Sequence, residues 1–66
     1  MHTEIQMYFR NGDKRGEPLR GEIVDVLPQA ESFKTPDGRP LRLVDIRPAN
    51  GEGVLTAYVL AEVILK

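Results

Sequence analysis

The sequence predicts an all-β domain, a small and strongly bent five-stranded barrel, and three observations favour this class. Apolar residues recur at every second position in several short runs, which is the spacing of a half-buried strand. Turn-forming residues separate these runs at short intervals, as in small all-β folds. The 66 residues make one domain, residues 1–66, and we consider them too few for a sandwich of two sheets.

The first strand is expected over residues 5–10, where Ile5, Met7 and Phe9 alternate with other side chains. It should end at Asn11-Gly12, because both residue types tolerate a positive φ. A loop rich in glycine and charge then runs to Pro18.

The second strand is expected over residues 19–27, with a change of apolar phase inside it. Leu19 and Ile23 fall on one face, whereas Val24 and Val26 fall on the other. A bulge, a sharp bend or burial on both faces would explain this change. Gly21 fits a bend or a close backbone approach, which a tightly curved strand requires.

Two further strands are expected around a strong turn. A short strand is predicted near residues 32–35, led by Phe33, and the turn Thr35-Pro36-Asp37-Gly38 follows it. Proline presets φ in such a turn, and glycine takes the left-handed position. The next strand covers residues 41–47 and shows a second phase change, before a turn at residues 50–53.

The C-terminal segment, residues 54–65, admits two interpretations. Apolar residues at every second position favour a strand, and so do its many β-branched residues and the lack of an N-cap. A break near residues 60–62 would split it into two short strands. The alternative is a C-terminal helix at about 54–65, which would make the fold α+β, because Leu55, Val59 and Val63 also share a helical stripe.

The run from Ile5 to Gly12, followed by Leu19-Arg20-Gly21-Glu22-Ile23, resembles the opening of an Sm/Hfq-like barrel. There a strand ends in Asn-Gly or Asp-Gly, and the next begins with an apolar-x-Gly-x-apolar bend. The closing segment, residues 57–64, is also similar to the end of SH3-like barrels, in which a strand, a one-turn 3₁₀ helix and a last short strand close the fold. Both resemblances imply a fold, and a fold alone does not assign a function.

Catalytic, metal and cofactor sites are not expected. The chain has no cysteine and a single histidine, His2, so the usual zinc ligand sets are absent. No glycine-rich phosphate motif occurs, and Ser32 has no neighbouring base in the sequence to activate it. We therefore predict a protein that is not an enzyme and needs no metal or cofactor. No signal peptide or membrane span is recognisable, so a cytoplasmic location is expected.

The charge of the chain is small but unevenly placed. The net charge of −1 argues against a general polyanion binder. Residues 10–20 and 34–47 each hold four basic against two acidic residues, however, so a basic surface would form if they meet. The predicted contacts to nucleic acid or an acidic partner are Tyr8, Arg10, Lys14, Arg15, Arg20, Lys34, Arg39 and Arg42.

The phase changes suggest a second kind of surface. After each phase change, apolar side chains point to the second face of the strand, and they form an interface if no other part of the chain covers them. The residues expected at this interface are Val24, Val26, Val44 and Ile46. We therefore expect an interaction module that binds a protein partner, within transcription or RNA-related machinery. A nucleic-acid-binding barrel that uses the basic loop 10–20 is the first alternative, and a structural homo-oligomer subunit is the second.

Overall fold

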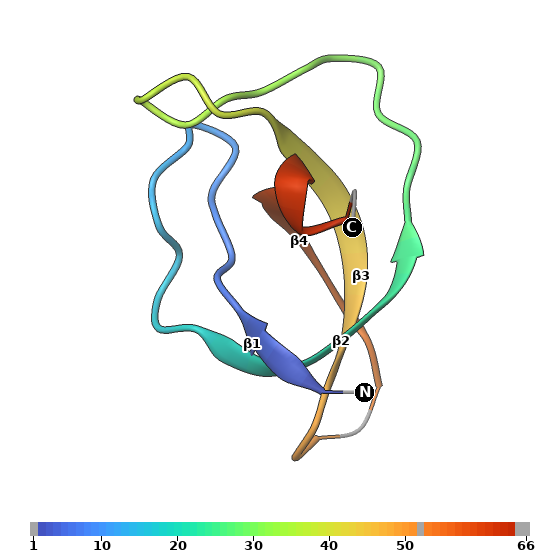
Figure 1. The fold of residues 1–66 in the computed structure, drawn as a ribbon. Helices are drawn as coiled ribbons and strands as arrows, with labels where there is room; N and C mark the ends of the chain where they lie inside the picture. Colours follow the sequence, from blue (N-terminus) through green and yellow to red (C-terminus); the bar gives the residue numbers. More distant parts are fainter. Residues whose placement is uncertain (1, 52, 65–66) are drawn as a thin grey trace.

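A curled antiparallel sheet of four strands makes up most of the fold in a computed structural model, which describes residues 2–51 and 53–64 (Figure 1). The strands follow the chain in the order β1-β2-β3-β4, and a short 3₁₀ helix, η1, follows the last of them. Their bounds are β1 Thr3–Ile5, β2 Leu19–Val26, β3 Leu41–Pro48, β4 Leu55–Leu60 and η1 Ala61–Val63. The all-β class is confirmed, whereas the prediction of five strands is wrong: the described residues form a half-barrel of four.

The curl brings the segment after β1 back to β4. The Tyr8 N–H donates a hydrogen bond to the carbonyl oxygen of Tyr58 at 2.8 Å, and Tyr8 also forms a bridge with Lys14. The prediction of a first strand over residues 5–10 is therefore wrong: β1 lies over Thr3–Ile5, and beyond Ile5 Tyr8 makes only isolated bridges. These bridges draw the two ends of the sheet together around a buried interior.

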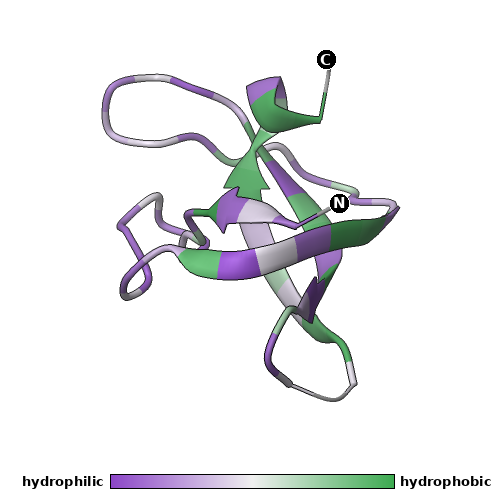
Figure 2. Ribbon diagram, turned by 60° about the horizontal axis from the view of Figure 1, so that its bottom comes forward, coloured by the Kyte–Doolittle hydropathy of each residue, from purple (hydrophilic) through white to green (hydrophobic). Residues whose placement is uncertain are grey.

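The core lies on the concave side of the sheet. Val44 pairs with Ala57 across β3 and β4, and residues directly opposite each other share a face. Ile46 and Val59 join them, and Ile5 reaches the same cluster from β1. Figure 2 shows hydrophobic residues mainly in the strands and in the C-terminal turn, while the loops are mostly hydrophilic.

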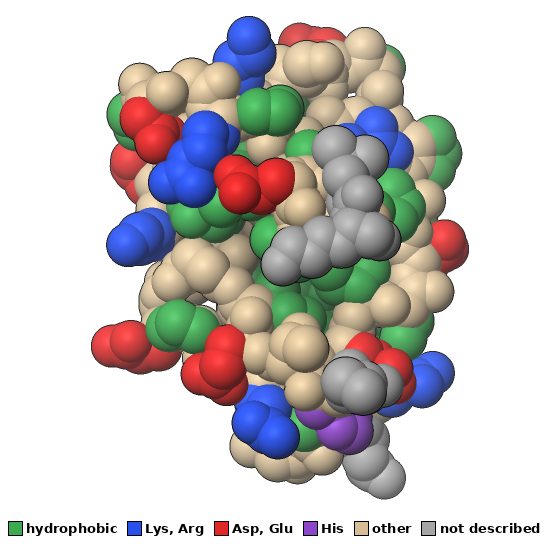
Figure 3. Space-filling model, viewed as in Figure 1, with side chains coloured by type: hydrophobic (Ala, Val, Ile, Leu, Met, Phe, Trp, Pro, Cys, Tyr) green, Lys and Arg blue, Asp and Glu red, His purple; other side chains and the backbone are tan. Residues whose placement is uncertain are grey.

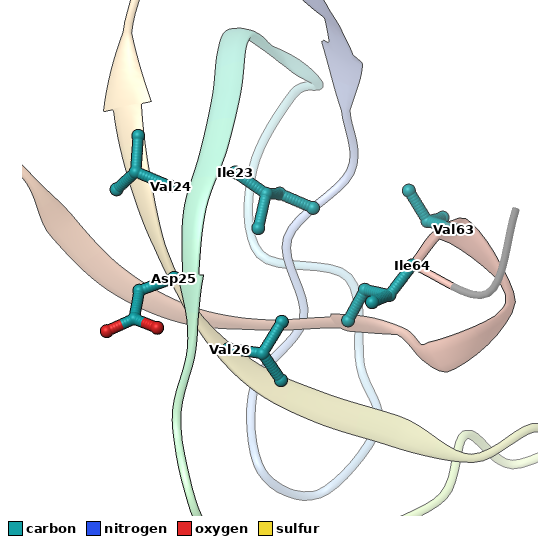
Figure 4. Close-up of a pocket in the computed structure, with 6 residues that line it drawn as sticks. All are labelled: Ile23, Val24, Asp25, Val26, Val63 and Ile64. Atoms are coloured by element: carbon teal, nitrogen blue, oxygen red, sulfur yellow. The ribbon is translucent and has the colours of Figure 1, made fainter.

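The phase change in β2 has one of the three causes that the sequence left open. The register between β2 and β3 shifts between Ile23 and Asp25, which is a bulge at Val24. Gly21 lies where two backbones approach closely, because a Cβ atom there would be 2.5 Å from the carbonyl oxygen of Arg47. Because of the bulge, Val24 and Asp25 both point to the side of the strand opposite Ile23, and Val26 returns to the side of Ile23 (Figure 4). The prediction that Val24 and Val26 share a face is therefore wrong.

The phase change in β3 is explained by burial on both faces. Leu43 pairs with Tyr58 on the face opposite the core, and Phe33 of the loop between β2 and β3 contacts this face. The Phe33 ring meets the Tyr58 ring edge-on, with centroids 5.5 Å apart. The strand predicted near residues 32–35 is absent, since only Lys34 forms an isolated bridge there, to Pro40. The turn is as predicted, with Gly38 at φ 88°.

The C-terminal segment is a strand that breaks into a 3₁₀ turn. Leu55–Leu60 is extended, and Ala61–Val63 forms the one-turn break expected near residues 60–62. The alternative of one helix over 54–65 is therefore wrong for the described part of this segment, and Leu65 lies outside the described residues.

Candidate functional site

A hollow lies between the second half of β2 and η1. Its volume is about 540 Å³. The residues that line it are Ile23, Val24, Asp25, Val26, Val63 and Ile64 (Figure 4). Figure 3 looks at the face that carries η1 and shows hydrophobic atoms in its middle, with charged side chains mostly toward its edges.

The bulge decides which side chains face this hollow. Ile23 and Val26 point from β2 toward Val63 and Ile64, whereas Asp25 points to the other side of the strand (Figure 4). Val26 and Val63 remain 40% and 44% exposed, although valine is among the residues most often fully buried. The described part of the fold thus leaves an apolar floor in contact with solvent.

A second hollow, of about 350 Å³, adjoins the first. Thr3, Glu4, Glu62 and Val63 line it, so Val63 belongs to both. The charged residues in the two linings are Glu4, Asp25 and Glu62, which are all acidic. We call the two hollows together the apolar seam; its chemistry is an apolar floor with an acidic rim.

The four residues predicted for an interface lie in two different environments. Val24 and Val26 do lie at the apolar seam. Val44 and Ile46 do not, because both are fully buried in the core, at 0% exposure. The phase change in β3 turned these two side chains inward and left Leu41 and Leu43 on the other face, so Val44 and Ile46 cannot contribute to a surface in this fold.

Three apolar residues of the seam were missing from the sequence prediction: Ile23, Val63 and Ile64. Ile23 had been assigned to a strand face, and the other two to a closing strand. The signal that could have found them is the predicted break near residues 60–62, because a one-turn break redirects the side chains that follow it.

The two basic stretches do meet in space. The loop after β1 touches the loop before β3, and a Cβ atom on Gly12 would lie only 2.6 Å from the carbonyl oxygen of Lys34. A third hollow, of about 340 Å³, forms at this junction. Its lining residues are Tyr8, Gly12, Asp13, Lys14, Thr35, Pro36, Asp37 and Arg39. Two cationic and two anionic side chains share this lining, so the junction carries no strong excess of positive charge.

The remaining predicted contact residues are spread over several places. Arg10 lies over the Phe33 ring at 5.7 Å, and Arg15 lies over the Phe9 ring at 6.0 Å. Arg42 donates a hydrogen bond to the Leu27 carbonyl oxygen at 3.0 Å. Arg20 lies on β2 opposite Glu4, away from the loop junction.

Electrostatic coupling at the junction centres on Asp37. A hydrogen bond donated by the Thr35 hydroxyl, and a second from Arg39 Nε at 3.0 Å, lower the pKa of the Asp37 carboxyl below its ordinary value of 3.8. Asp37 in turn raises the pKa of Arg39. Arg39 is thus held by the turn and by Glu62, whose Oε1 lies 3.4 Å from Arg39 Nη1.

Comparison with protein-family models, with curated proteins and with solved structures finds no match to this chain. Within residues 2–51 and 53–64, no three histidine, aspartate or glutamate side chains are grouped so as to hold a metal ion. None of the helices in this part of the chain is long and apolar enough to cross a membrane. Its function is therefore argued from the surfaces described above.

Proposed function

We propose that this chain is a non-catalytic interaction module, of SH3-like or Sm-like barrel type, that binds a protein partner through the apolar seam. The observation that carries the proposal is the exposed apolar floor formed by Val26 and Val63 next to Ile23 and Ile64. Contiguous exposed apolar surface usually marks an interaction site in a soluble domain. A concave apolar site with a few polar groups at its rim is also the usual form of a ligand pocket.

Selection of peptides from a random phage-displayed library tests this proposal. We expect the immobilised protein to enrich peptides whose binding depends on the seam. In the variant Val26→Lys these peptides should bind at least about tenfold more weakly, because a charge replaces a buried apolar contact.

Val54→Lys is the matched control. Val54 is 50% exposed and lines neither hollow of the seam, so the same substitution there should leave affinity nearly unchanged. Circular dichroism checks that both variants fold. If nothing is enriched, or if the two substitutions weaken binding equally, the seam is not a protein-binding site.

A nucleic-acid-binding barrel remains the second candidate, and the meeting of the two basic stretches favours it. Lys14 and Arg39 line the junction, and Arg10 lies near the Phe33 ring. Phosphate groups are contacted by such cations, and bases stack on aromatic rings. Asp13 and Asp37 in the same lining reduce its attraction for phosphate, and for this reason we place the candidate second.

A further inference from the structure

The outer edge of β2 is the feature on which this inference depends. Over residues 23–26 this strand pairs with β3 on one side. On its other side the register with β1 stops at Gly21, and no described strand continues it. The unpaired N–H and C=O groups of a strand edge are a template for pairing with another chain. Because the first hollow runs along these same residues, backbone pairing and apolar burial are available at one place.

The side chains of this edge define what an added strand would contact. Successive side chains of a strand point to opposite faces of a sheet. Those on one face would meet Ile23 and Val26, with Val63 behind them, and would bury apolar area (Figure 4). Those on the other face would lie beside Asp25, which points away from the hollow.

The charge of the seam favours a basic partner. Asp25 lies directly opposite Asp45 in the register of β2 and β3, and like charges in that position repel. Asp45 accepts a hydrogen bond from the Thr56 hydroxyl at 2.6 Å, and no ion pair to Asp25 or Asp45 is found among the described residues. A lysine or arginine beside them would relieve this repulsion.

The acidic residues of the adjoining hollow add further negative charge to the seam. Glu62 is only weakly neutralised by Arg39, because both side chains are more than half exposed to solvent. Glu4 faces Arg20 across β1 and β2. Within residues 2–51 and 53–64, no basic residue lines either hollow of the seam, so the charge of the described lining favours a positively charged partner.

We propose that the outer edge of β2 binds an extended segment of a partner protein in which apolar and basic residues alternate. Its apolar side chains fill the hollow against Val26 and Val63, and its basic side chains pair with Asp25. The bound segment supplies the fifth strand that the curled sheet lacks, by strand addition. This inference rests on the proposed function, since it names the occupant of the same seam.

A second copy of the chain is a poorer occupant. Antiparallel pairing of two β2 edges about Val24 would gather the Asp25 and Asp45 carboxylates of both copies at one seam. Charged side chains and bulges on an edge are the devices by which natural sheets resist such pairing. The negative charge at Asp25 therefore discourages self-association, whereas a partner that brings a cation is attracted to the same edge.

Three synthetic peptides test the chemistry of the occupant: an alternating Lys-Val peptide, an alternating Glu-Val peptide, and a peptide with the Lys-Val composition arranged in two blocks. Fluorescence anisotropy measures affinity, and amide chemical shifts locate binding. We expect the alternating Lys-Val peptide to bind most tightly and to shift the amides of residues 23–26 and 63–64. Raising the salt concentration should weaken its binding, because exposed ion pairs are screened.

A charge exchange sharpens the test. Asp25→Lys should lower the affinity for the Lys-Val peptide by about two- to fivefold, which corresponds to the free energy of one exposed ion pair. It should raise the affinity for the Glu-Val peptide. Glu17→Lys is the matched control, because it makes the same change of charge at an exposed residue outside the seam. It should leave the ranking of the peptides unchanged.

Several results would overturn the inference and leave the proposed function intact. Equal affinity for the two alternating peptides, or equal effects of Asp25→Lys and Glu17→Lys, would refute the preference for basic residues in the partner. Binding of library-selected peptides that depends on Val26 but leaves the amides of residues 23–26 unshifted would remove the added strand. A dimer in light scattering, with those amides protected from exchange before any peptide is added, would make a second copy the occupant. If no peptide binds in a way that depends on Val26, the proposed function itself is refuted.

Discussion

Replacing Gly21 by alanine should destabilise the fold without touching the proposed binding surface. A Cβ atom at this position would lie 2.5 Å from the carbonyl oxygen of Arg47 and 3.1 Å from the Cα atom of Pro48. Both neighbours are backbone atoms of β3, so neither can rotate away. Ordinary contact begins at 3.4 Å, and the two strands must therefore separate by about 0.9 Å at this point.

The cost of this separation follows from the packing and pairing that it disturbs. Overpacking by a single added group typically costs about 1–3 kcal/mol. A domain of 66 residues has a free energy of unfolding of roughly 3–10 kcal/mol, at about 0.05–0.15 kcal/mol per residue. We therefore expect Gly21→Ala to remove a large share of the stability and to lower the melting temperature by roughly 4–8 °C for each kcal/mol lost.

Urea denaturation followed by far-UV circular dichroism measures the effect, and Gly51→Ala is its control. A Cβ atom on Gly51 would lie 3.6 Å from the Cβ atom of Pro48, which is ordinary contact, and its backbone is not left-handed. The control should change the free energy of unfolding by less than about 0.5 kcal/mol. Equal midpoints for the two variants, at equal slopes, would refute the argument that close backbone approach selects glycine at position 21.

Two further predictions concern the loop junction. Hydrogen bonds in the folded state lower the pKa of Asp37, so the stability that its carboxylate contributes is present above the ordinary pKa of 3.8 and is lost as the pH falls through the lower folded-state value. Urea midpoints measured from about pH 5 downward should therefore fall less steeply with decreasing pH for Asp37→Asn than for the wild type. If the two proteins show the same dependence of the midpoint on pH, the hydrogen bonds to Asp37 do not lower its pKa in the folded state. The nucleic-acid candidate predicts binding to short RNA or DNA that weakens steeply with salt and is lost in the double variant Lys14→Glu/Arg15→Glu, whereas no binding in anisotropy titrations at low salt would eliminate it.

Local chemistry made much of the fold predictable. The alternation of apolar residues located β2, β3 and β4, and the Thr35–Gly38 turn was recognisable because proline and glycine leave few alternatives there. A bulge was one of three explanations that the sequence left open for the phase change in β2, and the register between β2 and β3 shows that it is the one present. These features depend on a few neighbouring residues, which is why a single sequence reveals them.

The parts that failed depend on contacts between distant segments. The alternation at Ile5, Met7 and Phe9 suggested a long first strand, but pairing with β2 stops at Ile5, and Tyr8 bridges to Tyr58 instead. The assignment of Val44 to an interface failed for the same reason. A phase change shows that both faces carry apolar residues, but only the partner segments decide which face is inside.

The bridge between Tyr8 and Tyr58 has a consequence for the order in which the molecule assembles. It joins residues far apart in the sequence, whereas β3 and β4 meet across a short turn. Contacts between distant residues carry a larger loop-closure entropy, and they slow folding relative to local pairing. The β3–β4 hairpin is therefore expected to form early, and the N-terminal arm to dock last, which makes that arm the first segment to open in amide exchange.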